Sequence, residues 1–338
     1  MTSRNANAVT NNKSNMGSDE IELTVIAPMY NEADNIETTI SMIEETMSDF
    51  DKPWEFLIID DGSDDNTLDI ARRFERQSTN LRVLHYPVNC GRGKALRTGF
   101  KHAQGRYVVS IDFDLSYSPD HIRKIYEELA DPGQMNDVVL GSAYMKDGKV
   151  IGVSPLRYFI SKIGNKILQY TFPQSFKTST CILRGYTMEV LKTLELESNG
   201  KEIHLEILSK VCALGYTVKE IPATLSKRRA GRSKFKFRNT SISHLLFSIF
   251  ERPILMFGIA GFFFLASGFL IGCYIVWLRY FGTLNPSRPL VPLMIILLLL
   301  GSQFFCFAFI AIQNNHLRNE VYRLQKQINL LRARKSEE

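Results

Sequence analysis

The chain has 338 residues, of which 45% are hydrophobic and 22% charged, and its net charge is +6. This length exceeds that of one average domain and is too short for three. The basic residues concentrate around two apolar segments near the C-terminus, which favours contact with anionic lipid or a phosphate substrate and argues against a nucleic-acid partner. The five cysteines have no metal-binding or redox spacing, so we expect reduced, structural thiols.

The N-terminal half alternates between strand and helix patterns. Residues 1–20 are rich in Asn, Ser and Thr without an apolar run, and are predicted to be a disordered leader. Strands are then predicted at residues 22–27, 54–59 and 81–85. Each is followed by a polar or glycine-rich turn and a helix, at residues 33–48, 67–77 and up to about 103. This alternation predicts an α/β fold with a mostly parallel, doubly wound sheet whose loops gather at one edge.

The next apolar segment, residues 107–116, contains Asp112 and Asp114. It is predicted to be a buried strand that ends in these carboxylates, and the alternation of strand side chains would put both on one face. In an open α/β sheet, ligands bind at the carboxyl ends of the strands, and a divalent cation held by one or two carboxylates is a usual partner of a diphosphate. Asp112 and Asp114 are therefore candidate metal ligands, although an isolated Asp-x-Asp pair is more often a turn or capping feature.

Further elements lead from the sheet to the membrane. Strands are predicted at residues 137–141 and 216–221, and a helix at 202–213. Residues 155–172 have one apolar face, which is typical of a helix that faces the core or lies in the membrane interface, and the nearby membrane segments favour the interface. A soluble domain is thus predicted over residues 21–238, ending in a basic stretch. Residues 239–252 are predicted to form a juxtamembrane amphipathic helix.

Two segments without charge, residues 254–278 and 290–312, are long enough to cross a bilayer. We predict transmembrane helices at 253–278 and 290–312, joined by an extracytoplasmic loop at 279–289; the alternative for either is a buried core helix. The loop contains only two basic residues, whereas many flank the spans on the other side. The positive-inside rule therefore predicts a protein of the cell membrane with its soluble domain and both termini in the cytoplasm.

The last 26 residues, 313–338, are predicted to form a cytoplasmic amphipathic helix. Its apolar residues step by four and three: Leu317, Val321, Leu324, Ile328 and Leu331. About two heptads fit a self-association helix and a lone amphipathic helix on the membrane equally well. A homo-oligomer formed through the membrane helices and this helix is one of the open alternatives.

Four polar or glycine-rich turns are predicted at the same edge of the sheet. They are Tyr30-Asn-Glu32, Asp60-Asp61, Gly91-Arg-Gly-Lys94 and Asp112-Phe-Asp114. The third lacks the spacing of a Walker loop, and no Gly-x-Gly-x-x-Gly follows the first strand, which disfavours a dinucleotide site. Acidic groups that accept hydrogen bonds from a base or ribose, together with a metal pair, better suit a mononucleotide diphosphate.

In this order, the motifs resemble those of the family-2 glycosyltransferases, which have the GT-A fold. Within that family, the chain is most similar to the dolichyl-phosphate mannose synthase and polyprenyl-phosphate glucosyltransferase branch. The resemblance is carried by residues 25–32, 59–64, 89–95, 99–105, 112–115, 157–165, 205–207, 215–222 and 228–234, followed by the two membrane segments. It implies a GT-A domain followed by two transmembrane helices and the C-terminal amphipathic helix.

The resemblance also implies roles for individual residues. The nucleotide would be held by Pro28, Tyr30, Glu32, Asp60, Asp61 and Lys94. Catalysis would depend on Asp112, Asp114, Arg228 and Lys234, with Mg²⁺ or Mn²⁺ on the two aspartates. The acceptor phosphate would meet Arg157, Lys146 and Ser233. The chain departs from the common family pattern at Ala143, Ser116 and Lys177, where relatives often have arginine, glutamine and aspartate.

The reaction expected from this resemblance is transfer of one hexose from a GDP-mannose or UDP-glucose type donor to dolichyl or polyprenyl phosphate at the cytoplasmic face, with inversion. A phosphate monoester has a second pKa of about 6, so the acceptor is already an anionic nucleophile at neutral pH. Consistent with this, the chain has no Glu-Asp dipeptide, where many soluble relatives keep a general base. Bringing two anions together calls for a metal and several cationic side chains.

Two other functions fit the sequence less well. A processive polysaccharide synthase of the same fold would carry a Gln-x-x-Arg-Trp motif, and neither of the two tryptophans lies in that setting. A non-catalytic membrane sensor of sugar nucleotides would tolerate loss of the metal pair or of the basic stretch, and both are present.

Overall fold

The computed structural model describes residues 20–152, 165, 176–226, 253–282 and 289–337. Its centre is a seven-stranded sheet with the order β3-β2-β1-β4-β7-β5-β8. The strands are β1 Leu23–Met29, β2 Trp54–Asp60, β3 Leu81–His85, β4 Tyr107–Ser110, β5 Val138–Ser142, β7 Arg184–Thr187 and β8 Val218–Pro222. Neighbouring strands are parallel, except that β7 runs antiparallel to both β4 and β5. The predicted mostly parallel α/β sheet is confirmed.

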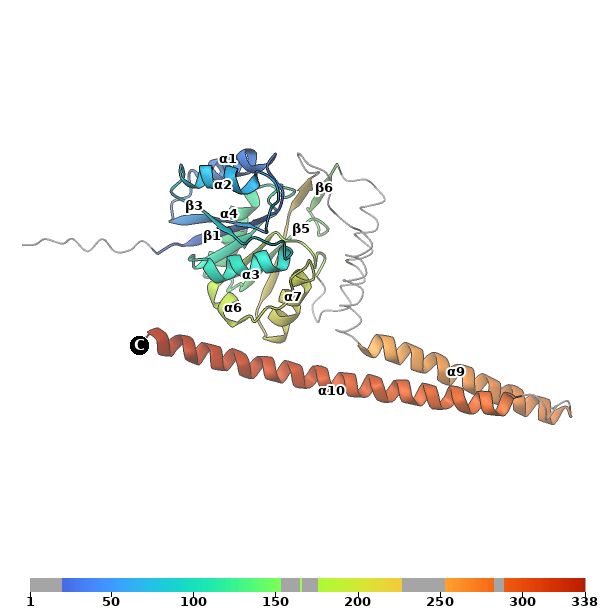
Figure 1. The fold of residues 1–338 in the computed structure, drawn as a ribbon. Helices are drawn as coiled ribbons and strands as arrows, with labels where there is room; N and C mark the ends of the chain where they lie inside the picture. The colour runs from blue at the N-terminus through green and yellow to red at the C-terminus, as the bar shows by residue number, and fades with distance from the viewer. Residues whose placement is uncertain (1–19, 153–164, 166–175, 227–252, 283–288, 338) are drawn as a thin grey trace, which may run out of the picture.

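Helices cover both faces of the sheet. They are α1 Ile36–Met47, α2 Thr67–Glu75, α3 Arg92–His102, α4 Asp120–Ala130, α6 Met188–Thr193 and α7 Ile203–Ala213. In Figure 1, α1 and α2 lie on one side of the sheet, and α3, α6 and α7 lie on the other. Most of the predicted strands and helices of the sheet domain agree with these bounds to within about three residues; the strand predicted at 107–116 is an exception, and α4, α6 and β7 were not predicted.

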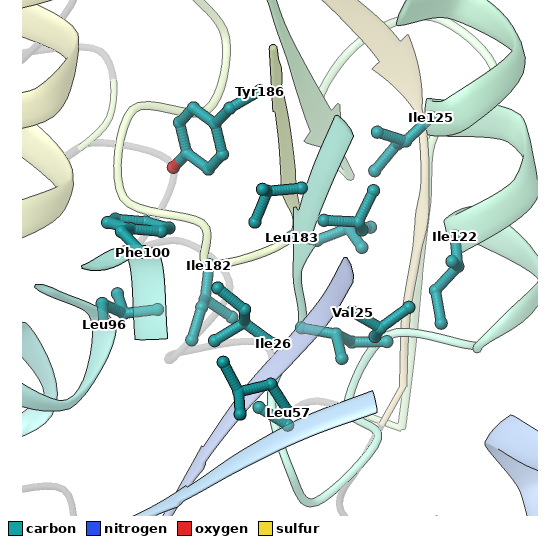
Figure 2. Packing of buried hydrophobic residues seen from close by; sticks show 14 of the residues in the cluster. Val25, Ile26, Leu57, Leu96, Phe100, Ile122, Ile125, Ile182, Leu183 and Tyr186 are labelled. Atoms are coloured by element: carbon teal, nitrogen blue, oxygen red, sulfur yellow. The ribbon is translucent and has the colours of Figure 1, made fainter. Parts of the chain in front are cut away.

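The core fills both faces because side chains alternate along the buried strands. Figure 2 shows the consequence on β1, where Ile26 lies towards Leu96 of α3 and its neighbour Val25 lies towards Ile122 of α4. Phe100 of α3 contacts Tyr186 of β7 edge to face, with 5.3 Å between the ring centroids. The carboxyl ends of β1, β2 and β4 are thereby fixed between two packed layers.

The strand ends differ from the predictions at two places that matter for the site. The predicted strand over residues 107–116 stops at Ser110, so Asp112 and Asp114 lie in the following turn rather than on a strand face. The strand predicted at residues 22–27 instead extends to Met29, with Pro28 paired to Ile59 of β2. Pro28 is tolerated because the pairing of β1 with β4 ends at Ile26, so no ladder bond on that side needs its missing N–H.

A small second sheet lies beside the main one. It pairs β6, Lys149–Ile151, in parallel with β9, Thr224–Ser226. The sequence pattern did not predict either strand, because three residues are too few to show a period. The segments beyond these strands that contain Arg157, Arg228, Ser233 and Lys234, together with the leader and the predicted helices at 155–172 and 239–252, lie outside the described residues, apart from Asn165.

Two long helices, α9 Pro253–Tyr280 and α10 Leu290–Glu337, follow the sheet domain and pack against each other (Figure 1). Both are long and apolar enough to span a membrane. Large apolar side chains such as Phe262, Phe269 and Leu299 are 64–69% exposed, which is inconsistent with buried core helices. The helices α9 and α10 can approach closely because small residues lie where they meet: a Cβ at Gly301 would lie 2.6 Å from Leu265.

The helix α10 is a single uninterrupted element of 48 residues, so the predicted span at 290–312 and the predicted helix at 313–338 have no structural break between them. Its C-terminal part also contacts the sheet domain at α6 and α7. Tyr322 packs against the edge of the domain core, and the Lys210 ammonium lies 5.7 Å from the centre of its ring.

Candidate active site

The turns after β1 and β2 are joined by hydrogen bonds. Asn31 has a positive φ of 52°, a conformation that asparagine tolerates better than most residues, and its backbone N–H donates to the Ser63 hydroxyl at 2.9 Å. Its side-chain oxygen accepts from the backbone N–H of Asp64 at 2.8 Å. The Tyr30 hydroxyl donates to the Asp64 carboxylate at 3.1 Å, and this bond raises the pKa of Tyr30. The first two predicted turns therefore form one unit.

Glu32 lies at the same junction. Its backbone N–H donates to the Thr67 hydroxyl at 2.9 Å, at the start of α2. Its carboxylate accepts from the Asn35 amide at 2.6 Å, just before α1. Pro28 sits three residues after Val25 near the end of β1 and is half-buried. These two candidate nucleotide ligands are held in place by the ends of two strands and two helices.

The adjacent aspartates at the end of β2 have separate partners. Asp60 is fully buried and lies 2.8 Å from Nδ1 of His85, the last residue of β3, and it accepts from the Ser63 hydroxyl at 2.5 Å. Asp61 instead accepts from the loop before α3: from the Tyr86 hydroxyl at 2.6 Å and from the backbone N–H groups of Cys90 and Gly91, each at 2.9 Å. Burial and then the Asp61 carboxylate raise the pKa of Tyr86. The observed contacts of Asp61 therefore hold the glycine-rich turn.

The fourth turn carries the two candidate metal ligands. Asp112 forms an ion pair with Arg92, the first residue of α3, with 3.0 Å between Oδ1 and Nη2. Asp114 accepts from both the backbone N–H and the hydroxyl of Ser116, at 3.0 and 2.5 Å. Arg92 was not among the predicted site residues, although it stands in the glycine-rich motif that was singled out. Ser116, one of the positions where the chain departs from the expected family pattern, therefore contacts a candidate metal ligand directly.

This turn is held rigidly by its neighbours. The Thr39 hydroxyl of α1 donates to the backbone oxygen of Phe113 at 2.7 Å, and the Phe113 side chain is 3% exposed. Leu115 has a positive φ of 49°, which is rare for a leucine, and its backbone N–H donates to the oxygen of Asp112 at 3.1 Å. Asp112 and Asp114 therefore stand in one tight turn, and not on one face of a strand as predicted.

Two glycines of the glycine-rich turn allow the loop of residues 198–200 to pack closely against it. The backbone N–H of Gly93 donates to the oxygen of Asn199 at 2.7 Å. A Cβ on Gly93 would lie 2.4 Å from the Ser198 oxygen, and one on Gly91 would lie 2.6 Å from the Asn199 oxygen. Glycine is therefore required at both positions by the close approach of residues 198–200. Lys94 follows on the same helix and is half-buried.

The small sheet brings the start of the basic stretch to this edge. The backbone N–H of Ser226, the last residue of β9, donates to the oxygen of Ser116 at 2.8 Å. Tyr117 forms an isolated bridge with Leu225. The segment that contains Arg228, Ser233 and Lys234 therefore follows directly after a contact with Ser116, which is two residues after Asp114 in the sequence. Lys146 is exposed in the turn between β5 and β6.

Ala143 and Lys177, the other two positions where the chain departs from the expected family pattern, lie among hydrogen bonds that hold the fold. The Ser142 hydroxyl lies 2.7 Å from that of Thr178, next to Ala143. The backbone N–H groups of Lys177 and Thr178 donate to the Glu220 carboxylate at about 2.9 Å, so Lys177 reaches Glu220 through its backbone and not through its charge. Asn165 is buried and accepts from the backbone N–H of Ser179 at 3.1 Å.

The donor set suits a hard divalent cation. Asp112 and Asp114 supply carboxylate oxygens, and Mg²⁺ in nucleotide sites usually has one or two carboxylates, with the phosphates and water completing its shell. Within the residues that the structure describes, no cluster of three or more His, Cys, Asp or Glu side chains could hold a metal by itself. These two carboxylates fit a cation whose shell is completed by phosphate and water, and Asp112 would have to leave its ion pair with Arg92 to bind it.

The four predicted turns are thus one continuous cluster, linked by Tyr30 with Asp64, by Asp61 with Gly91 and by Arg92 with Asp112. Residues 24–195, which contain all four turns, match the model of the family described as glycosyl transferase family 2. The chain belongs to glycosyl transferase family 2.

Relatives in this family match most of the chain. An undecaprenyl-phosphate 4-deoxy-4-formamido-L-arabinose transferase of Klebsiella pneumoniae (strain 342) is 25% identical over 305 residues, which cover 89% of this chain and 90% of that protein. A dolichol-phosphate mannosyltransferase of Pyrococcus furiosus is 30% identical over 218 residues, which cover 64% of this chain and 60% of that protein.

The glycosyltransferase fold also matches a solved structure. The glucosyl-3-phosphoglycerate synthase of Mycobacterium tuberculosis, in complex with Mn²⁺, uridine diphosphate and phosphoglyceric acid, aligns with a TM-score of 0.51. The alignment covers 68% of this chain and 78% of that chain, at 20% sequence identity. At that identity, the likeness supports the Rossmann-like GT-A fold predicted from the motifs.

Proposed function

We propose that this family-2 glycosyltransferase transfers a single hexose from a nucleotide diphosphate sugar to dolichyl or polyprenyl phosphate at the membrane. The observation that carries the proposal is the joined edge of β1, β2 and β4, where Asp112 and Asp114 lie beside the nucleotide-side turns. The long apolar helices α9 and α10 and the names of the relatives support a lipid-linked acceptor. The product would serve as a lipid-linked sugar donor for glycan assembly or protein glycosylation.

In the proposed reaction, an oxygen of the lipid phosphate attacks the anomeric carbon of the sugar. The bond from that carbon to the diphosphate breaks, the leaving diphosphate keeps the electron pair, and the configuration inverts. Mg²⁺ or Mn²⁺ on Asp112 and Asp114 would supply charge neutralisation for the leaving group. Tyr30, Glu32 and Asp60 would orient the nucleotide, and Arg92, once released from Asp112, would add a cation beside the diphosphate.

The roles of the basic segments belong to the same proposal. Arg228, Ser233 and Lys234 would close over the phosphates, and the bond between Ser226 and Ser116 supports this because it starts their segment beside the metal turn. Arg157 and Lys146 would contact the acceptor phosphate. The excess of basic residues outside the short loop between the spans supports a cytoplasmic site.

The reaction is tested by incubating membranes that contain the protein with a panel of labelled nucleotide sugars and a lipid-phosphate extract. We expect label in lipid from one donor, lost on chelation and restored by Mg²⁺ or Mn²⁺. Asp114→Asn should lower the rate by about a hundred-fold or more, because it removes a metal ligand with little change in shape. Asp120→Asn, on the exposed start of α4, is the matched control and should retain the rate.

Transfer that survives both the chelator and Asp114→Asn would contradict metal-dependent catalysis at this site. Donor binding without transfer to any lipid phosphate would instead favour a sugar-nucleotide sensor.

A further inference from the structure

The C-terminal half of α10 presents an exposed apolar row. Its five members are between 50% and 65% exposed: Leu317, Val321, Leu324, Ile328 and Leu331. An apolar row of this length on a helix surface usually marks an interaction site. Three occupants are conceivable in this fold: the sheet domain, the lipid surface and another helix.

The sheet domain contacts a different side of α10. The crevice between them is lined by Tyr322 and Gln325 of α10 and by residues around α6 and α7, including Lys210 and Leu214. Tyr322 and Gln325 are three residues apart and so share a helix face, which lies next to the apolar row rather than on it. The domain therefore leaves the row open.

The continuity of α10 also argues against lipid as the occupant of the row. The helix runs without a break from its apolar part, residues 290–312, to Glu337. The 25 residues beyond 312 extend about 38 Å at 1.5 Å per residue. By its apolar composition, the candidate membrane span within α10 is Leu290–Gln325, but its 36 residues would extend about 54 Å at 1.5 Å per residue, whereas the hydrocarbon core of a bilayer is about 30 Å thick. A continuous helix that crosses the core from Leu290 therefore carries the row out of the bilayer, so the row does not lie flat on the surface as a separate amphipathic helix would.

The row continues as a heptad pattern towards the membrane. With Leu317, Leu324 and Leu331 at d positions, Val321 and Ile328 fall at a positions. Counting back, Asn314 takes the preceding a position and Ile310 the preceding d position, and Ile310 is 53% exposed. The pattern thereby reaches three heptads. β-Branched residues at a with leucine at d favour a parallel two-stranded coil, and one asparagine at a fixes register and strand number.

We propose that this row binds the same row of a second copy of the chain, as a parallel, in-register, two-stranded coiled coil that continues out of the membrane. Membrane insertion gives both copies the same orientation, which is the orientation the heptad pattern favours. The flanking g and e positions would place Glu320 against Gln325 of the second copy, and Gln313 against Arg318. Neither pair brings like charges together.

Cysteine cross-linking in membranes tests the arrangement. With a mild oxidant, Leu324→Cys should form a covalent dimer several-fold more efficiently than Arg323→Cys, because facing d residues approach each other and c residues point outwards. The unmodified chain gives the baseline from its own cysteines, among which Cys90 is exposed. Equal cross-linking of the two variants, or none, would overturn the proposal. Protection of the Leu324→Cys thiol from a water-soluble maleimide without cross-linking would assign the row to lipid and also overturn it.

The mass of the full chain in mild detergent gives a second test. We expect the mass of two chains, which Leu324→Asn should halve and Arg323→Asn should leave unchanged. Asn314→Leu should broaden the distribution to higher oligomers, since the polar a residue is what limits the strand number. An unchanged mass for Leu324→Asn would contradict the interface, and an unchanged distribution for Asn314→Leu would contradict the register. Neither test depends on sugar transfer, so the proposal stands or falls separately from the proposed reaction.

Discussion

The ion pair between Arg92 and Asp112 places a guanidinium on one of the two carboxylates that are proposed to hold the metal. Arg92 is 28% and Asp112 16% exposed, so the pair is partly screened by water. The guanidinium offsets the negative charge of one of the two carboxylates in the turn after β4. The pair also links the glycine-rich turn to the turn that contains Asp112 and Asp114.

Removing Arg92 should therefore strengthen metal binding in the absence of nucleotide. We expect Arg92→Gln to bind Mn²⁺ up to about five-fold more tightly, because a partly exposed ion pair is worth about 0.2–1 kcal/mol and competes with the metal for Asp112. The measurement is Mn²⁺ titration by electron paramagnetic resonance. Lys101→Gln, an exposed change on the same helix, should leave the affinity unchanged. Weaker Mn²⁺ binding by Arg92→Gln would contradict competition.

His121 of α4 holds β9 through a neutral imidazole. Its Nε2 accepts from the backbone N–H of Thr224 at 3.1 Å, and Nδ1 lies 2.9 Å from the oxygen of Ser118, so a proton on Nδ1 satisfies both partners. Burial, the largest cause, lowers the pKa of His121 below its ordinary value. Between the lowered folded pKa and the unfolded value of about 6.5, the unfolded chain binds more protons than the folded one.

The free energy of unfolding should consequently decrease as the pH falls below about 6.5, and this contribution should stop changing below the folded pKa of His121. Urea unfolding of the detergent-solubilised protein across this range measures the dependence. Other groups titrate there too, so the quantity of interest is the difference between the unmodified chain and His121→Gln, which should have a flatter profile. A difference that grows in the opposite direction on acidification would rule out a neutral buried His121.

At the scale of elements, the loop between α6 and α7 supports the glycine-rich turn. Burial would raise the pKa of Glu206, but Lys210 and the backbone N–H groups of Ser198 and Glu197 outweigh it, so the net pKa is lowered. The two N–H groups donate to the carboxylate at 2.9 Å each. A charged Glu206 therefore holds the loop whose Asn199 oxygen receives the Gly93 N–H.

A side chain at Gly93 should separate these elements. Gly93→Ala would bring its Cβ within 2.8 Å of three backbone atoms of residues 198–200, which no side-chain rotation can relieve. We expect a loss of about 2 kcal/mol or more in stability, together with reduced transfer, since Arg92 is displaced with the turn. Thermal unfolding and the transfer assay measure the two effects. Gly133→Ala, whose Cβ would meet only the Asp131 side chain at 3.2 Å, is the control. Unchanged unfolding in Gly93→Ala would refute the contact.

At the scale of the whole molecule, α10 belongs to the apolar helix pair and also contacts the catalytic domain. Its docking point at Tyr322 lies against Lys210, which bonds to Glu206 at 2.8 Å. Glu206 in turn holds the loop behind Gly93. A continuous set of contacts therefore runs from α10 to the glycine-rich turn, which is paired with Asp112 through Arg92.

Loosening that docking point should be visible in the domain. Tyr322→Ala should increase amide hydrogen exchange at the end of α7 and in residues 195–200, because it removes the packing and a cation–π contact worth about 0.5–1 kcal/mol at exposed sites. Arg323→Ala, one position along the same helix, should leave exchange in these segments unchanged. Equal exchange in both variants would show that α10 does not restrain the domain.

Much of the architecture follows from local sequence patterns. Apolar strands that alternate with amphipathic helices predict the mostly parallel sheet, and uncharged segments of more than 20 residues predict the helix pair, because both signals lie within a short window of the chain. The α4 helix carries the same kind of signal in Ile122, Ile125 and Leu129, although the prediction did not include it. By contrast, β7 begins at Arg184, which is fully buried and donates to three backbone oxygens, so its pattern does not mark it as a strand.

The site divides in the same way. The sequence by itself determined which turns carry the acidic and glycine-rich residues and that they meet at one edge, since parallel strands bring their carboxyl ends together. Only the tertiary structure decided that Arg92 pairs with Asp112, that Asp61 holds the loop before α3, and that Ser116 contacts Asp114. The physical reason is that hydrogen bonds between distant turns depend on how helices and strands pack, and that packing is not written in the spacing of any single motif.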